Sequence, residues 1–299
     1  MSAAQRVTET TDILGECPLW STAEQALYWI DIRRPGIQRW HPASDAVRYW
    51  PMPDLIGSIA LCRDSRLLVA SRSLFYLDTR TGEMTRFAPQ RDENPALRFN
   101  DGKCDRQGRF WVGTMNDRTR EPIGELFRVD GQGAVSVEAD VRVPNGTCFS
   151  PDGRTMYFAD SDLQTIFTYA LEPGTGVLGE RREFARTTLP AVPDGATVDE
   201  QGHIWVAEYG GWCIKRYAPD GSVDRVIDMP VQNPTSCTFG GRNLDTLYIT
   251  TASQRLSPEE LAKQPLAGAL LAFQPGVRGL PEPLFCGSAS SGTGDDTGH

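Results

Sequence analysis

The chain has 299 residues, of which 39% are hydrophobic and 23% charged, and its formal net charge is -9. This length and composition are typical of one large all-β globular domain or of two ordinary domains, and not of a disordered chain. The negative charge leaves no basic surface for neutralising phosphates, so we expect no nucleic-acid partner.

The sequence begins MSAAQRVTETTDILGE, which has no cationic start followed by an apolar run. No stretch approaches the ~18 apolar residues that cross a bilayer, so we expect neither a signal peptide nor a membrane partner. The seven cysteines form no CxxC pair, and four of them lie among strand-like residues, as small buried hydrophobes do: Cys62, Cys104, Cys148 and Cys237. The expected location is a reducing cytoplasm.

A unit of two strands joined by a short turn recurs six times along the chain. Each second strand carries an aromatic or bulky apolar marker residue, and successive markers are 40 to 48 positions apart. The markers are Tyr28, Leu68, Trp111, Tyr157, Trp205 and Tyr248. A further hairpin follows most units, so each repeat has about four antiparallel strands. The sequence therefore predicts an all-β fold, a six-bladed β-propeller of four-stranded antiparallel blades.

The two ends of the chain indicate how the ring closes. The last repeat runs out of strands near Cys286, whereas a strand-like segment, RVTETTDI, precedes the first repeat. We expect this N-terminal strand to complete the last blade, so that residues 1–286 form a single propeller domain. Residues 287–299 are rich in Gly, Ser and Asp and are expected to be a disordered tail. Two sandwich domains would not repeat at this spacing.

Four polar residues share one position in the repeat, just before the first strand. They lie 10 to 12 residues ahead of their markers and are Glu16, Asp101, Asn145 and Asp194. Asn-Gly and Asp-Gly pairs are most often turns. However, Asp152, which occupies such a hairpin turn, lies only 5 residues ahead of its marker. Because first strands line the channel of a propeller, we expect the four side chains to converge on its axis.

Three of these residues suit a metal ion. Glu16 and Asp194 bring two negative charges that would be costly to bury alone, and Asn145 adds a neutral carbonyl oxygen. A divalent cation cancels the charge, and three protein ligands leave positions open for water and substrate. Oxygen ligands suit Ca²⁺, Mg²⁺ or Mn²⁺ and do not exclude Zn²⁺ or Fe²⁺. Two interpretations stay open, a catalytic ion and a calcium ion that only stiffens the channel.

Five motifs in order resemble the gluconolactonase / senescence-marker-protein (regucalcin) family. They are LGECPLW, RFNDGKCDRQGRFWVGTM, PNGTCFSPDG, PDGATVDEQGHIWVAEYGG and TSCTFGG, and the resemblance runs from about Thr10 to Cys286. It implies a six-bladed propeller of the bacterial sugar-lactonase type that hydrolyses sugar lactones with one divalent metal ion in its channel. The family's metal ligands fall on the three residues named above.

The resemblance also implies residues that contact the substrate. The family's arginine and asparagine fall on Arg98 and Asn100. Its glutamate falls in the loop NDRTREPIGELFR, which offers both Glu121 and Glu125. We assign the role to Glu121, because Glu125 is expected to begin a strand; a solvated loop carboxylate is the alternative.

The predicted reaction is the opening of a cyclic ester by water. Asp194 is the predicted ligand and base, and Asp101 is the alternative base because it lies at a similar position. The three histidines, His41, His203 and His299, lie far from these positions in the predicted fold, so histidine-based chemistry is disfavoured. The alternatives are a non-catalytic metal- or ligand-binding propeller and an esterase acting on another substrate class. We expect a small sugar lactone as the partner, and a monomer or weak homo-oligomer.

Three loops are candidates for selecting the substrate, and the alternative, which we favour for their individual residues, is that they are ordinary surface loops. One contains Arg72, one is the turn from Glu208 to Trp212, and one is TASQRLSPEELAKQPLAG. In the last loop, Ser257 and Glu260 form the sequence pattern of a capping box that begins a short helix.

Overall fold

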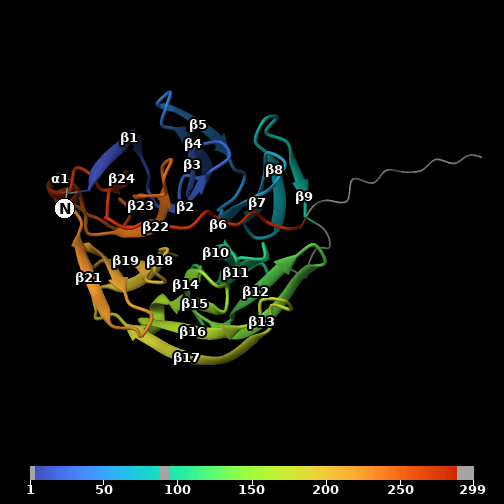
Figure 1. Ribbon diagram of the computed structural model, residues 1–299. Helices are drawn as coiled ribbons and strands as arrows, with labels where there is room; N and C mark the ends of the chain where they lie inside the picture. The colour runs from blue at the N-terminus through green and yellow to red at the C-terminus, as the bar shows by residue number, and fades with distance from the viewer. Residues whose placement is uncertain (1–3, 88–93, 288–299) are drawn as a thin grey trace, which may run out of the picture.

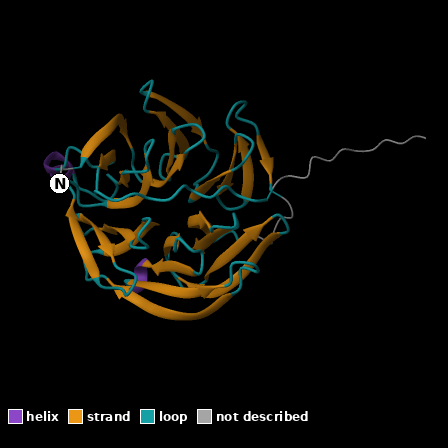
Figure 2. Cartoon of the chain, in the orientation of Figure 1, coloured by secondary structure: helices purple, strands orange, loops and turns teal. Residues whose placement is uncertain are grey.

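The structure is a computed structural model that describes residues 4–87 and 94–287. Within these residues the strands form six four-stranded antiparallel sheets, which Figures 1 and 2 show as blades arranged around a ring. The predicted six-bladed propeller is confirmed. Helix is confined, in the same residues, to one short α-helix, α1 (Pro258–Lys263), and one 3₁₀ turn, η1 (Ser161–Leu163).

Each blade is built from strands that follow one another along the chain. The first blade contains β2 (Gly15–Ser21), β3 (Ala26–Asp31), β4 (Gly36–His41) and β5 (Ala46–Pro51). The second contains β6 (Ser58–Leu61), β7 (Arg66–Ala70), β8 (Leu74–Asp78) and β9 (Met84–Arg86). The third contains β10 (Arg98–Cys104), β11 (Phe110–Met115), β12 (Gly124–Asp130) and β13 (Gly133–Val141). The next two contain β14 (Pro144–Phe149), β15 (Thr155–Asp160), β16 (Thr165–Leu171) and β17 (Leu178–Arg186); and β18 (Val192–Val198), β19 (Ile204–Tyr209), β20 (Cys213–Tyr217) and β21 (Val223–Asp228).

The sixth blade takes strands from both ends of the chain. It contains β22 (Pro234–Gly240), β23 (Thr246–Thr251), β24 (Ala269–Phe273) and the N-terminal β1 (Gln5–Thr11). β1 runs antiparallel to β24, with Gln5 opposite Ala272 and Thr11 opposite Ala269. The predicted ring closure is therefore confirmed.

The marker residues of the repeat hold neighbouring blades together. All six are buried, and Tyr28, Leu68, Trp111 and Trp205 are fully so. Between blades, the ring of Trp20 on β2 stacks on Tyr248 of β23 with 5.6 Å between centroids. Trp205 on β19 meets Phe239 of β22 at 5.9 Å. Since burying one large apolar side chain contributes about 1.5–3 kcal/mol, these contacts stabilise the two blade junctions that they bridge.

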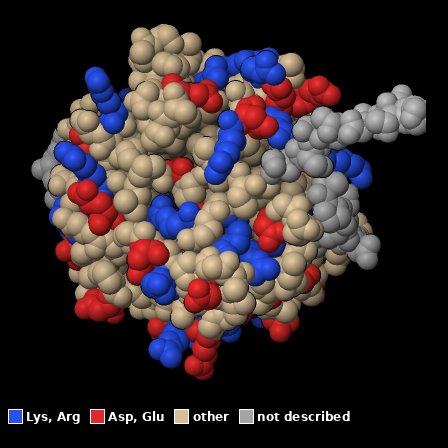
Figure 3. Space-filling model, turned by 45° about the vertical axis from the view of Figure 1, so that its right-hand side comes forward, with Lys and Arg blue, Asp and Glu red and all other residues tan. Residues whose placement is uncertain are grey.

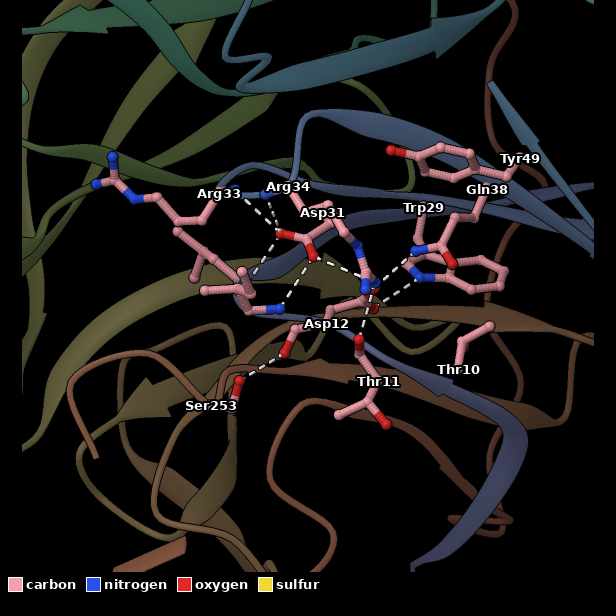
Figure 4. Close-up of polar contacts among 12 residues, drawn as sticks. Thr10, Thr11, Asp12, Trp29, Asp31, Arg33, Arg34, Gln38, Tyr49 and Ser253 are labelled. Carbon is pink, nitrogen blue, oxygen red and sulfur yellow. Dashed lines mark hydrogen bonds and ion pairs between the residues drawn. The ribbon is translucent and has the colours of Figure 1, made fainter. Parts of the chain in front are cut away.

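Asp12 links the closing strand to the first blade (Figure 4). Its buried carboxylate accepts hydrogen bonds from Trp29 Nε1 at 2.9 Å and from Gln38 Nε2 at 2.7 Å. Its backbone N–H donates to the carbonyl oxygen of Gly268, which precedes β24, at 2.7 Å. Burial raises the pKa of Asp12 to about 7, and the nearby charge of Asp31 adds to this rise. The ring is thus closed by side-chain as well as strand contacts.

A C-terminal segment, residues 278–287, crosses the end of the channel where the hairpins between first and second strands lie. Figure 1 shows it in red, running across the ring. The amide of Phe285 donates to Leu61 O at 2.7 Å, and that of Cys286 donates to Gly108 O at 2.8 Å. Oε1 of Glu282 accepts from Lys103 Nζ at 3.4 Å and from Thr238 Oγ1 at 3.1 Å, which joins the third and sixth blades. This crossing segment was not predicted. The predicted tail, residues 287–299, was placed one residue too early, because Gly287 is buried and its carbonyl oxygen accepts a hydrogen bond from the Tyr76 hydroxyl at 2.6 Å. Residues 288–299 lie outside the described residues.

On the face that Figure 3 shows, basic and acidic side chains are mixed, and neither forms an extended patch. In the described part of the chain, no helix is long and apolar enough to cross a membrane. The cysteines in the same part are all free of disulfides, and Cys104, Cys148 and Cys237 are buried as predicted, while Cys62 is partly exposed.

Candidate active site

The first strands of five blades are irregular where they begin. Their pairing with the second strand shifts register by a bulge at Glu16/Leu19, Phe99/Gly102, Asn145/Cys148, Pro193/Ala196 and Pro234/Ser236. β6, which carries none of the four predicted polar residues, pairs with β7 without a shift. A β-bulge turns side chains away from the alternation of a regular strand. The bulges therefore let Glu16, Asn145 and Asp194 leave the sheet pattern at the same end of the channel.

The backbone around these residues explains the glycines that follow two of them. Gly146 has φ +59°, a left-handed conformation that favours glycine. A Cβ on Gly195 would lie 2.1 Å from Ser236 Oγ on the neighbouring first strand. The Asn145-Gly146 and Asp194-Gly195 pairs are therefore parts of strands that approach each other closely, and not hairpin turns. The interpretation from repeat spacing is consistent with this geometry.

A cavity of about 250 Å³ opens at this end of the channel. Four of the predicted residues line it, namely Arg98, Asn100, Asn145 and Asp194. The predicted substrate-selecting loops contribute Tyr209, Gln254 and Arg255. Further polar lining residues were not predicted: Arg33, Asp117, Arg120 and Ser161. The size suits a small molecule, since pockets for drug-sized ligands are typically ~300–1,000 Å³.

Glu16 and Asp194 form a strained electrostatic pair. Both are almost fully buried, at 8% and 7% exposure, and their carboxyl groups interact directly. Burial raises the pKa of Glu16 well above its usual range, and repulsion from Asp194 raises it further. Burial likewise raises the pKa of Asp194, with repulsion from Asp101 as the next cause. The protein thus brings together the buried carboxyl groups of Glu16, Asp101 and Asp194, which act on one another electrostatically.

These residues fit a hard divalent cation. The amide nitrogen of Asn145 donates to Ser161 Oγ at 2.8 Å, which fixes the orientation of the amide and leaves Oδ1 as the oxygen donor. Two carboxylates and this oxygen make an all-oxygen set of the kind that Ca²⁺ or Mg²⁺ prefers. In the part of the chain described, no three His, Cys, Asp or Glu side chains form a metal-binding group. The set therefore depends on the amide of Asn145.

Arg98 and Asn100 belong to one hydrogen-bond network beside the pair. Arg98 Nη1 donates to Asn100 Oδ1 at 2.7 Å, and Arg98 Nη2 donates to Asp117 Oδ1 at 2.7 Å. Asn100 Nδ2 donates to Asn145 Oδ1 at 3.2 Å and to Pro144 O at 2.8 Å. Nε of Arg98 is buried and has no hydrogen-bond partner among the described residues. It is an unsatisfied buried donor on a residue that lines the cavity.

The structure places the other predicted residues away from the cavity wall. Asp101 is buried, does not line the cavity, and accepts a hydrogen bond from Thr147 N at 2.8 Å. Glu121 is exposed and accepts from Thr119 Oγ1 at 2.9 Å, and neither it nor Glu125 lines the cavity. His41 and His203 do not line it either, while His299 lies outside the described residues.

Comparisons with known proteins identify the family of the chain. The family model described as "SMP-30/Gluconolactonase/LRE-like region" matches residues 14–253. A 6-deoxy-6-sulfogluconolactonase of Pseudomonas putida is 40% identical over 94% of this chain and 98% of that protein. An L-arabinolactonase of Azospirillum brasilense is 35% identical over 95% and 96%. The crystal structure of a calcium-binding protein, regucalcin, from Agrobacterium tumefaciens matches with TM-score 0.89 and 30% identity, covering 95% of this chain and 97% of that one. The chain therefore belongs to the SMP-30/gluconolactonase/LRE-like family.

Proposed function

We propose that this protein is a lactonase that opens sugar lactones to aldonic acids with one divalent metal ion held by Glu16, Asn145 and Asp194. The observation that carries the proposal is the buried pair of carboxyl groups of Glu16 and Asp194, whose pKa values are both raised by burial. Asp194 and Asn145 line a cavity that also contains Arg98, whereas Glu16 is buried and does not line it. The relatives named as lactonases for sulfogluconolactone and L-arabinolactone support the sugar-lactone class.

The residues of the chain have distinct roles in this reaction. A divalent ion bound there would supply Lewis acidity toward the lactone carbonyl and lower the pKa of a bound water. Asp194 accepts a proton from the attacking water at its carboxylate and returns it to the ring oxygen, which leaves the carbonyl carbon as a hydroxyl group. We assign this role to Asp194 and not Asp101, because Asp194 lines the cavity and Asp101 does not.

The substrate is held by donors on the cavity wall. The guanidinium group of Arg98, which lines the cavity, donates to a substrate hydroxyl in addition to its hydrogen bonds to Asn100 and Asp117. Because a hydrogen bond to a charged group contributes about 1.5–3 kcal/mol, this contact favours hydroxylated lactones over simple ones. Asn100 also lines the cavity and donates a hydrogen bond to Asn145, a proposed ligand of the metal ion.

The proposal is tested by a pH-indicator assay over pentono- and hexonolactones. The protein is stripped with a chelator, and Ca²⁺, Mg²⁺, Mn²⁺, Zn²⁺ and Fe²⁺ are added back one at a time, with spontaneous hydrolysis subtracted. We expect turnover only with metal present. Stoichiometric calcium binding without hydrolysis of any lactone would instead favour a non-catalytic calcium-binding propeller; the Agrobacterium regucalcin is described as a calcium-binding protein.

A further inference from the structure

The wall of the active-site cavity is rich in arginine. Four arginines line it, namely Arg33, Arg98, Arg120 and Arg255. The cavity wall is therefore rich in positive charge although the whole chain has a net charge of -9. The two carboxylates assigned to the metal ion, Glu16 and Asp194, are not available to neutralise the arginines once a divalent cation is bound.

Two of these arginines share a single carboxylate. Arg33 contacts both oxygens of Asp117, at 2.8 and 3.1 Å, and Arg98 contacts Oδ1 at 2.7 Å. Burial opposes the ionisation of Asp117, yet hydrogen bonds from Arg33 and the charge of Arg98 hold its pKa at about 2. The carboxylate is therefore fully ionised at neutral pH, and the group of three still carries one excess positive charge.

Arg255 has no acidic partner among the described residues. It is exposed, it lines the cavity, and within residues 4–87 and 94–287 its side chain takes part in no hydrogen bond or ion pair. It lies in the predicted substrate-selecting loop between β23 and α1, with φ +64°, a conformation that arginine rarely adopts. Arg120, by contrast, pairs with Asp162 at 3.2 Å. Arg255 is thus a free guanidinium group at the mouth of the site.

The positive charge continues into a neighbouring cavity of about 480 Å³. This cavity shares Arg98 and Asp117 with the first and adds Arg72 and Arg118 to its wall. Asp117 is the one acidic residue among the described residues that line it. Arg72 pairs with Asp54 at 2.8 Å, whereas Arg118 is exposed and has no ion pair in the described part of the chain. Both openings around the site therefore present excess guanidinium groups.

A neutral sugar lactone leaves these charges unmatched, whereas an anionic one pairs with them. Clefts lined by one sign of charge concentrate ligands of the opposite sign, and guanidinium groups bind carboxylate, phosphate and sulfonate oxygens through paired hydrogen bonds. We propose that the substrate is a sugar lactone with an anionic group at the end remote from the lactone carbonyl, and that Arg255 binds this group. This inference rests on the proposed lactonase function.

The test is a series of hexonolactones that differ only at carbon 6, which carries a hydroxyl, a carboxylate, a phosphate or a sulfonate. We expect the metal-loaded protein to show kcat/KM at least about tenfold higher for one or more anionic members than for the neutral one, and the preference to fall as salt is raised. The three anions in turn identify which group is recognised. We expect Arg255→Gln to lower the anionic-to-neutral ratio about tenfold and Arg255→Lys to retain most of it.

Arg182→Gln is the matched control, because Arg182 is an exposed arginine on the outer strand β17 with 78% of its side chain accessible. Arg182→Gln should leave the anionic-to-neutral ratio of kcat/KM unchanged. The melting temperatures of all variants show whether they fold. Equal kcat/KM for neutral and anionic lactones, or equal losses on both in Arg255→Gln, would overturn this inference and leave the lactonase proposal standing. Absence of turnover on every member of the series would overturn both.

Discussion

Asn100 Nδ2 donates a hydrogen bond to Asn145 Oδ1, the oxygen that we assign to the metal ion. Arg98 in turn donates to Asn100 Oδ1, so the direction of the Asn100 amide is set by a guanidinium group and passed on to Asn145. A residue predicted only to contact the substrate thus also orients a proposed ligand. This makes Asn100 a positioning residue for the metal site as well as part of the cavity wall.

Asn100→Ala should therefore weaken metal binding. Loss of a hydrogen bond that orients a ligand typically lowers metal affinity by about 10- to 100-fold, and we expect the lower end because Ser161 still holds the other side of the Asn145 amide. Calorimetric titration of the chelator-stripped protein with Ca²⁺ measures this without reference to activity. Asn243→Ala, at an exposed position, is the control, and equal affinities in the two variants would assign Asn100 to the substrate alone.

Asp194→Asn should abolish turnover by removing both a ligand charge and the proposed base. We expect a loss of at least about 10³-fold in kcat. Asp101→Asn is the matched comparison, because Asp101 is equally buried but does not line the cavity, and its loss should be much smaller. A larger loss in Asp101→Asn than in Asp194→Asn would transfer the role of base to Asp101.

Arg98→Lys should separate substrate recognition from chemistry. Lysine keeps the positive charge but loses the planar fork and the Nε donor of arginine. We expect kcat/KM for sugar lactones to fall by about one to two orders of magnitude, and that for a lactone without hydroxyl groups to fall less. If both substrates lose equally, Arg98 acts by supporting Asn100 and Asp117 instead of by binding hydroxyls.

Removal of residues 1–11 should open the ring. β24 would lose its partner strand and present an unpaired edge, so the melting temperature should fall by several degrees or more. We expect the full chain to unfold in a single cooperative transition, as one domain does, in differential scanning calorimetry. Removal of residues 288–299 serves as the control and should leave the transition where it is. An unchanged melting temperature without β1 would show that strand pairing at this edge contributes little.

Asp12 should make stability depend on pH. Its pKa is about 7 in the folded protein, above the ordinary value of 3.8, so the folded state binds its proton more tightly than the unfolded chain. The contribution of Asp12 to the free energy of unfolding is fully present below about pH 4 and is lost as pH rises toward 7. The charged groups facing Asp12 are Asp31 and Arg34. The side chain in Asp12→Asn cannot ionise, so the melting temperature of this variant should decline less between pH 5 and 8 than that of the wild-type protein. Parallel curves for the two proteins would contradict the assignment.

The architecture could be predicted from sequence because the same physical requirement recurs in every blade. A buried aromatic or aliphatic residue on each second strand, such as Trp111 or Trp205, is needed at every junction, so its spacing reveals the repeat. The convergence of Glu16, Asn145 and Asp194 could be predicted for a related reason, since all three share one position in that repeat.

The remainder of the site comes from segments that have no period. Arg33 and Asp117 lie 84 positions apart and follow strands of different blades, so their pairing depends on how two loops meet in space. The path of the crossing segment could not be predicted either, because Glu282 contacts Lys103 and Thr238, which come close together only in the closed ring. Arg255 lay in a loop that was predicted to select substrate, but nothing in the sequence indicated that it would lack an acidic partner.

The crossing segment also has a kinetic consequence. Beneath it, a cavity lined by Lys103 and Glu282 has a volume of about 10 Å³, close to the minimum that holds one water molecule. The crossing segment therefore narrows this end of the channel, and we expect substrate and product to use the openings at the other end, where the active-site cavity lies. The next substrate can bind only after the acid product has left, so the product should act as a competitive inhibitor, and the arginines at the mouth should slow its departure.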